Sequence, residues 1–165
     1  PLSGSHLIEA SAGTGKTFSI ATLYLRLVLG HSPDSQSARA YLPPEMLVVT
    51  FTDAATKELR DRIRARLSAA ASCFRAGGTA QAPLGIDSGE WELLEKLRDT
   101  YDPGQWSELA GRLQLAAEWM DEAAISTIHG WCNRMLSEHA FDSGSLFEQT
   151  LQQNADQVIA EVTRD

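Results

Sequence analysis

Residues 9–17 read Glu9-Ala10-Ser11-Ala12-Gly13-Thr14-Gly15-Lys16-Thr17. They follow a short apolar run, Leu7-Ile8, and precede a helix-like segment at residues 18–29. The order strand, small-residue loop, Lys-Thr and helix is that of a phosphate-binding P-loop. Small residues let backbone N–H groups approach phosphates closely, and the start of the following helix adds partial positive charge. The stretch therefore predicts an α/β nucleotide-binding fold with its first strand at Leu7 and Ile8.

We expect Lys16 and Thr17 to carry the chemistry of this loop. Lys16 would reach the β- and γ-phosphates of ATP as a point charge, and the Thr17 hydroxyl would ligate the Mg2+ that bridges them. Ala10 departs from the general pattern, which has Gly at its first position. ATP and Mg2+ are therefore the expected cofactors, and the other expected ATP-binding residues are Ala10, Ser11, Ala12, Gly13, Thr14 and Gly15.

The composition is that of a globular domain, with 43% hydrophobic residues in a chain of 165, enough for a packed core. There is no apolar run of bilayer length and no signal-peptide pattern, so we expect a cytoplasmic protein with no membrane partner. Cys73 and Cys132 lie far apart, which favours reduced thiols over a disulfide or a zinc site. The chain begins at Pro1 rather than Met, which predicts an excerpt of a longer polypeptide.

The formal net charge of -8 is unevenly distributed. Residues 53–66 hold five basic side chains against three acidic ones, whereas residues 87–122 hold ten acidic against three basic. The acidic total argues against a simple basic nucleic-acid-binding domain, but a locally basic face remains compatible with nucleic acid. Four arginines point several ways around the helix predicted there, and we expect most of them to be solvated: Arg60, Arg62, Arg64 and Arg66.

Three successive strand–helix units organise the chain. The helix at residues 18–29 is apolar on nearly every side, which predicts burial against a sheet. The second unit joins a strand at residues 46–51, apolar as in a parallel strand covered on both faces, to a helix at residues 54–72. The third joins a strand within residues 121–128 to a helix that begins at His129.

Two acidic amphipathic helices, at residues 90–99 and 105–120, occupy an insertion of about residues 77–120. A last helix at residues 146–162 follows a turn and would begin a helical subdomain at about residues 148–165. Gly30 is a candidate C-cap, and Thr52 or Asp53 a candidate N-cap. The whole predicts a three-layer α/β fragment with a parallel sheet.

The three strand ends carry residues that a P-loop does not explain. Because carboxyl ends of parallel strands meet at one edge, the segment Thr50-Phe51-Thr52 would lie near Thr127 and His129. Phe51 could stack on a base of single-stranded nucleic acid, while the hydroxyls and the imidazole bond phosphates. The ordinary alternatives are that Phe51 packs in the core and that His129 caps a helix. The residues themselves do not decide between these roles and a nucleic-acid contact.

Three motifs, in this order, resemble those of UvrD/Rep-type superfamily 1 helicases. They look like motif I, motif Ia and the next DNA-contact motif, and they are residues 10–17, Val49-Thr50-Phe51-Thr52-Asp53-Ala54-Ala55 and Thr127-Ile128-His129-Gly130-Trp131-Cys132. Longer phrases at residues 7–17, 120–124 and 143–149 are most similar to the beta-type helicase–nuclease subunits of exodeoxyribonuclease V. The similarity runs over nearly all 165 residues.

The resemblance implies that residues 1–165 are the N-terminal part of a RecA-like, ATP-binding helicase domain. The intact subunit would be an ATP-dependent 3′–5′ DNA helicase and exonuclease that moves on single-stranded DNA. With gamma and alpha subunits it would unwind and degrade duplex DNA ends in recombinational double-strand break repair. The resemblance assigns DNA contacts to Phe51 and His129, and backbone contacts to Thr50, Thr52 and Thr127.

Two positions depart from the family's pattern, Ser3 and Asp53, and a third, Ala10, fits it. Asp53 stands where relatives tend to carry Glu or Asn. Ala10 is common in this branch, which removes the oddity at the start of the P-loop. The family often has a Gln ahead of the loop that reads adenine, and the corresponding residue here is Ser3.

Motif II is missing from these residues, since no strand followed by Asp-Glu comes after the third unit, and an arginine finger and a nuclease carboxylate cluster are missing too. We therefore expect residues 1–165 alone to bind ATP weakly at most and not to hydrolyse it. Two alternatives remain. A P-loop small-molecule kinase would leave Phe51 and His129 unexplained, and a noncatalytic nucleotide-binding interaction module would have a vestigial P-loop.

Overall fold

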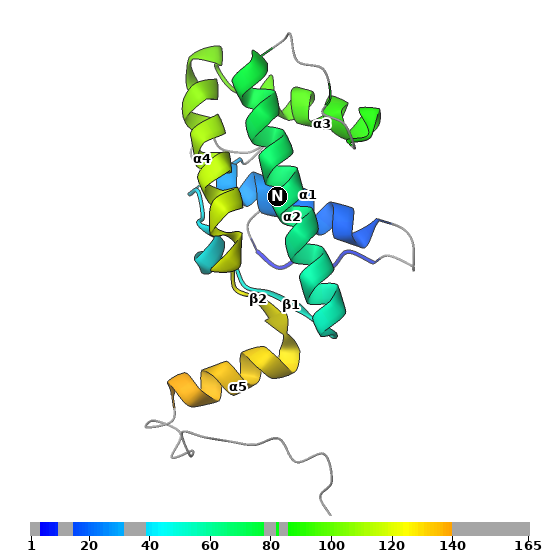
Figure 1. Ribbon diagram of the computed structural model, residues 1–165, viewed down its shortest axis with the longest axis vertical. Coiled ribbons are helices and arrows are strands. Elements are labelled where there is room, and N and C mark those ends of the chain that lie inside the picture. The colour runs from blue at the N-terminus through cyan, green and yellow to red at the C-terminus, as the bar shows by residue number, and fades with distance from the viewer. Residues whose placement is uncertain (1–3, 10–14, 32–38, 78–81, 83–85, 140–165) are drawn as a thin grey trace, which may run out of the picture. The chain divides into compact units, whose positions relative to one another are not determined.

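The structure is a computed structural model, which describes residues 4–9, 15–31, 39–77, 82 and 86–139 (Figure 1). The chain divides into two compact units, residues 1–127 and residues 128–165. Each unit is described by itself below.

The first unit is built around α2 (Asp53–Ala76), a helix of 24 residues. The helix α4 (Trp106–Glu118) runs antiparallel beside α2, and α1 (Lys16–Leu29) crosses both (Figure 1). Each helix has apolar residues three or four positions apart, so the three bury their apolar faces in one core. The fully buried side chains of this core include Leu25, Val28, Ile63, Leu67, Phe74, Leu113 and Met120.

The helix α3 (Ser88–Arg98) packs against α2 and buries Trp91 and Leu94. The two acidic helices predicted from the sequence are thus confirmed as α3 and α4, with bounds shifted by two residues at most. Short 3-10 helices lie in the connections, among them η1 (Pro43–Glu45), η3 (Pro103–Gln105) and η4 (Trp119–Asp121).

Two short strands, β1 (Val48–Thr50) and β2 (Ile125–Thr127), pair in parallel near the first residues of α2 (Figure 1). The connection between them runs through the helices, as a parallel pair requires. Arg60 of α2 donates to the carbonyl oxygen of Ile125 at 3.0 Å, which ties the helix to the sheet. Both strands were predicted, but each is shorter than the segment predicted for it.

The first strand predicted at Leu7 and Ile8 is not formed. Residues 5–9 have no regular secondary structure, and the two side chains are 85% and 64% exposed. A two-residue apolar run buries little surface, and a sheet of two three-residue strands offers little to pack against. The predicted burial of α1 against a sheet is also wrong. The small sheet offers little surface, and α1 packs mainly on α2 and α4.

The helix ends follow the predicted capping rules. Gly30 ends α1 with a φ of 64°, and its N–H donates to the carbonyl oxygens of Arg26 and Leu27. Thr52 is the N-cap of α2, since its hydroxyl accepts from the N–H of Ala55. Both cysteines are free thiols as predicted, Cys73 buried and Cys132 exposed.

The second unit contains α5 (Ile128–Glu138), the helix predicted to follow the third strand. The predicted turn at residues 142–145 and the helix at residues 146–162 lie outside the described residues. Among the helices that the structure describes, none combines the length and the apolar character needed to cross a membrane.

Candidate functional site

The first candidate site is the start of α1. Gly15 has a φ of 83°, in the left-handed region, and its carbonyl oxygen accepts the first helical hydrogen bond, from the N–H of Ser19 at 2.9 Å. A Cβ added to Gly15 would meet only Phe18, at 3.9 Å, so backbone conformation rather than space calls for glycine here. Lys16 and Thr17 are the first two residues of the helix, as the P-loop pattern predicts.

Electrostatics at this helix start suit an anion. The first turn of α1 contains no acidic residue, so the partial positive charge of the helix end is not offset there. Lys16 is exposed and Thr17 is half-buried. Residues 10–14, the remainder of the predicted ATP-binding loop, and Ser3 lie outside the described residues.

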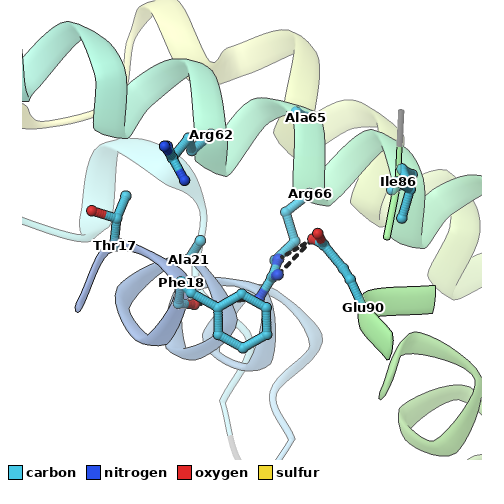
Figure 2. Close-up of a pocket in the computed structure, with 9 residues that line it drawn as sticks. Thr17, Phe18, Ala21, Arg62, Ala65, Arg66, Ile86 and Glu90 are labelled. Atoms are coloured by element: carbon cyan, nitrogen blue, oxygen red, sulfur yellow. Dashed lines mark hydrogen bonds and ion pairs between the residues drawn. The ribbon is translucent and has the colours of Figure 1, made fainter. Parts of the chain in front are cut away.

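A cavity of about 170 Å³ lies beside Thr17, between α1, α2 and the start of α3 (Figure 2). Its lining combines apolar side chains with two guanidinium groups and one carboxylate. Arg62 reaches from α2 toward the start of α1, and Arg66 is joined directly to Glu90 by hydrogen bonds (Figure 2). The lining residues are Thr17, Phe18, Ala21, Arg62, Ala65, Arg66, Ala69, Ile86 and Glu90.

The expectation that most of the four arginines Arg60, Arg62, Arg64 and Arg66 are solvated is wrong, because only Arg62 is exposed and Arg64 is half-buried. Arg66 is only 6% exposed, and Arg60 is half-buried against the sheet. The sequence held a signal for Arg66, which falls three residues after Ile63 and seven after Leu59, on the buried face of α2. Arg64 pairs with Asp121 at 2.5 Å, and Arg62 pairs with Glu58 at 3.0 Å while remaining exposed.

The second candidate site is the carboxyl end of the sheet. Thr50 pairs in register with Thr127, so the two residues lie side by side as predicted. Phe51 follows Thr50 directly and is 88% exposed, so the alternative of a core phenylalanine is wrong. Thr52 is exposed as well.

Hydroxyl groups close the turn around Phe51. The Thr50 hydroxyl lies 2.6 Å from the Thr56 hydroxyl, and the Thr52 carbonyl oxygen accepts from both hydroxyls at 3.1 Å. The Thr52 hydroxyl accepts from the N–H of Ala55 at 3.2 Å. Because these groups bond one another, the side chain most open to a partner at this turn is Phe51.

His129 lies in the first turn of α5 and is exposed. It belongs to the second unit, so the structure brings together Thr50, Phe51, Thr52 and Thr127 without placing His129 among them. No group of three or more His, Cys, Asp or Glu side chains in the described part of the chain is arranged to hold a metal ion.

The model of the UvrD/REP helicase N-terminal domain family matches residues 1–164. The chain belongs to this family, which confirms the helicase class expected from the three motifs.

Curated relatives carry the name RecBCD enzyme subunit RecB. The Escherichia coli K12 protein is 51% identical over 152 residues, covering 92% of this chain and 12% of that protein. The Haemophilus influenzae protein is 44% identical over 151 residues with the same coverage, and the Mycobacterium tuberculosis protein is 31% identical over 159 residues. The chain therefore spans only about an eighth of the length of these relatives, since it covers 12–13% of each.

Proposed function

We propose that this chain is the N-terminal, ATP-binding part of a RecB-type helicase subunit. The intact subunit would move 3′ to 5′ on single-stranded DNA, driven by ATP hydrolysis. With the gamma and alpha subunits of an exodeoxyribonuclease V complex, it would unwind and degrade duplex DNA ends during recombinational repair of double-strand breaks. Family membership over residues 1–164 and the RecB names of the relatives support this proposal.

The observation that carries the proposal is the start of α1. A left-handed glycine leads directly into a helix whose first residues are Lys16 and Thr17, with no carboxylate in the first turn. Lys16 would bond the β- and γ-phosphates, and residues 10–15 would surround them with backbone N–H groups. The Thr17 hydroxyl is an oxygen donor of the kind Mg2+ prefers, and it borders the cavity between α1 and α2. Hydrolysis of the ATP bound at this site would supply the energy for movement along DNA.

The carboxyl end of the sheet would form part of the DNA track. Phe51, which is 88% exposed, would stack on a base, as aromatic side chains do in single-strand binding sites. Thr50, Thr52, Thr127 and His129 would contact the sugar–phosphate backbone. The Thr52 hydroxyl only accepts within the turn, from the N–H of Ala55, so its own O–H could donate to a phosphate oxygen. The Thr50 hydroxyl bonds the Thr52 carbonyl oxygen and the Thr56 hydroxyl, so it would exchange one of these bonds for a bond to phosphate.

Residues 1–165 would contribute one half of the ATP site. Hydrolysis also needs acids that hold Mg2+ and activate water, and the sequence from the end of β2 to residue 165 contains no Asp-Glu pair that would supply them. The parallel sheet of a RecA-like three-layer fold would likewise be completed by further strands. On this basis residues 1–165 alone would not hydrolyse ATP.

The test is DNA-stimulated ATP hydrolysis by the full-length protein with Lys16→Ala. We expect the turnover number to fall by roughly 100-fold or more, since a lysine aimed at the transferred phosphate stabilises the transition state. The matched control is Lys96→Ala, because Lys96 is an exposed lysine paired with Glu92 on α3. Unwinding of a duplex with a 3′ single-stranded tail, and not of one with a 5′ tail, tests the direction of movement.

The two other functions predict different results in the same assays. A small-molecule kinase would transfer phosphate to a metabolite and show no stimulation by single-stranded DNA. A noncatalytic module would have the same low ATPase activity in the wild type and in Lys16→Ala. Either result would contradict the helicase proposal.

A further inference from the structure

Arg66 is a buried charge in the middle of α2. Its side chain is 6% exposed, and among the described residues only Arg98 is a comparably buried charged residue, at 4%. A guanidinium removed from water needs several charge-assisted hydrogen bonds to offset the loss of hydration. The partners of Arg66 therefore indicate what this charge holds in place.

On one side Arg66 binds α3. Its Nε and Nη2 atoms donate to the same carboxylate oxygen, Oε1 of Glu90, at 2.8 and 2.5 Å (Figure 2). Glu90 lies in the first turn of α3 and is itself 27% exposed. The pair thus links the middle of α2 to the beginning of α3.

On the other side Arg66 binds the first turns of α1. Its Nη1 atom donates to the carbonyl oxygen of Phe18 at 3.3 Å and also to the Thr22 hydroxyl. That hydroxyl donates in turn to the Phe18 carbonyl oxygen at 2.8 Å. The guanidinium carbon also lies 3.9 Å from the centre of the Phe18 ring, a cation–π distance.

Phe18 is the residue next to Thr17, so Arg66 holds the turn of α1 that begins with Lys16 and Thr17. We propose that Arg66 is a positioning residue of the nucleotide site, and that Glu90 keeps its guanidinium in place and so couples α3 to that site. The inference rests on the proposed nucleotide function and adds to it. Arg66 itself would not contact the phosphates. It would act on the site through the backbone and ring of Phe18.

The arrangement depends on the shape of arginine. The guanidinium is a planar fork that serves Glu90 with two nitrogens and Phe18 and Thr22 with the third, whereas a lysine ammonium is one point charge. Arg66→Lys therefore keeps the charge but cannot keep all of these bonds. A shifted first turn would misplace Lys16 and Thr17, and we expect roughly 2- to 30-fold weaker nucleotide binding, the usual range for residues that act indirectly.

The experiment measures the Kd of fluorescent Mg-ADP, together with KM and kcat for ATP, in the full-length protein. The matched control is Arg98→Lys, which changes an equally buried arginine that pairs with Asp99 at 2.8 Å and lies 4.9 Å from the Trp106 ring. We expect Arg66→Lys to weaken nucleotide binding and Arg98→Lys to leave it unchanged, although both lower the thermal midpoint. Unchanged binding in Arg66→Lys, or equal weakening in both variants, would overturn the inference.

Glu90→Gln keeps the inference testable if Arg66→Lys does not fold, because it changes charge and little shape. We expect weaker Mg-ADP binding in Glu90→Gln, and little further weakening when it is added to Arg66→Lys, since both act through one contact. Binding of wild-type strength in Glu90→Gln would refute the role of α3. Lys16→Ala separates the two proposals. If this variant loses Mg-ADP binding, the nucleotide function holds whatever the result for Arg66→Lys. If it binds Mg-ADP like the wild type, the proposed function itself is wrong.

Discussion

Phe51→Ala is the substitution that separates a DNA contact from a structural role most clearly. The Phe51 ring is 88% exposed and lies just after β1, in a turn closed by hydroxyl–carbonyl bonds that do not involve its side chain. Removing the ring therefore deletes almost no packing. By contrast, the ring of Phe74 is 1% exposed, and Phe74→Ala would cost ~3–5 kcal/mol of folding free energy.

The expected effects of Phe51→Ala follow from this exposure. The free energy of unfolding should change by less than about 0.5 kcal/mol, as for other exposed positions. Loss of one base stack should weaken single-strand binding by ~1–3 kcal/mol, because aromatic stacking contributes that much per base. At 25 °C this corresponds to about 5- to 150-fold in Kd.

The assay is fluorescence anisotropy of a labelled single-stranded oligonucleotide, titrated with the full-length protein at fixed salt. Leu93→Ala is the matched control, since Leu93 is an apolar side chain on α3 that is 50% exposed. It should leave both Kd and the thermal midpoint unchanged. If Phe51→Ala binds DNA as tightly as the wild type, or if it loses affinity only together with stability, the stacking role is wrong.

Two further predictions concern Gly30 and His31, which follow the last residue of α1. Gly30→Ala should lower the free energy of unfolding by about 1 kcal/mol, because φ is 64° at this position. Gly111→Ala, inside α4, should raise it by roughly 0.5–1 kcal/mol, because an added Cβ meets nothing within 4 Å there. Thermal unfolding of both variants checks the two signs. Burial, and secondarily the charge of Arg26, lower the pKa of His31, whose Nδ1 lies 3.1 Å from the Tyr101 hydroxyl. The unfolded chain then takes up a proton before the folded one, so stability should decrease as pH falls below about 6.5; a midpoint that is flat between about pH 5 and 8, or that falls equally in His31→Gln, would contradict this.

Local signals predicted the helices well. Apolar spacing located α1 to α4 within a few residues, and Gly30 and Thr52 cap α1 and α2 because glycine and threonine suit those positions in any fold. The parallel direction of the sheet also followed from the strand–helix order, whereas the pairing of β1 with β2 comes from the structure. The helicase family followed from motif order rather than from any single residue.

Other features depend on contacts between distant segments and were not predicted. The sequence shows Arg60 and Arg66 as members of a basic run, but their neighbours, the carbonyl oxygen of Ile125 and the carboxylate of Glu90, come from residues 24 to 65 positions away. Leu7 and Ile8 looked like a strand because apolar residues precede a P-loop, yet a strand needs a neighbour with which to pair. The site residues Ala10 to Thr14 stay predictions.

The turn after β1 lowers the entropy cost of binding a partner on the Phe51 ring. The Thr50 and Thr56 hydroxyls lie within hydrogen-bond distance of each other and of the Thr52 carbonyl oxygen, so the backbone that carries the ring is ordered when the protein folds. A partner that stacks on the ring immobilises little more than the two torsions of one side chain, at ~0.5–1.5 kcal/mol. The backbone entropy of this turn is thus lost during folding, and only the smaller side-chain part is lost when a partner stacks on the ring.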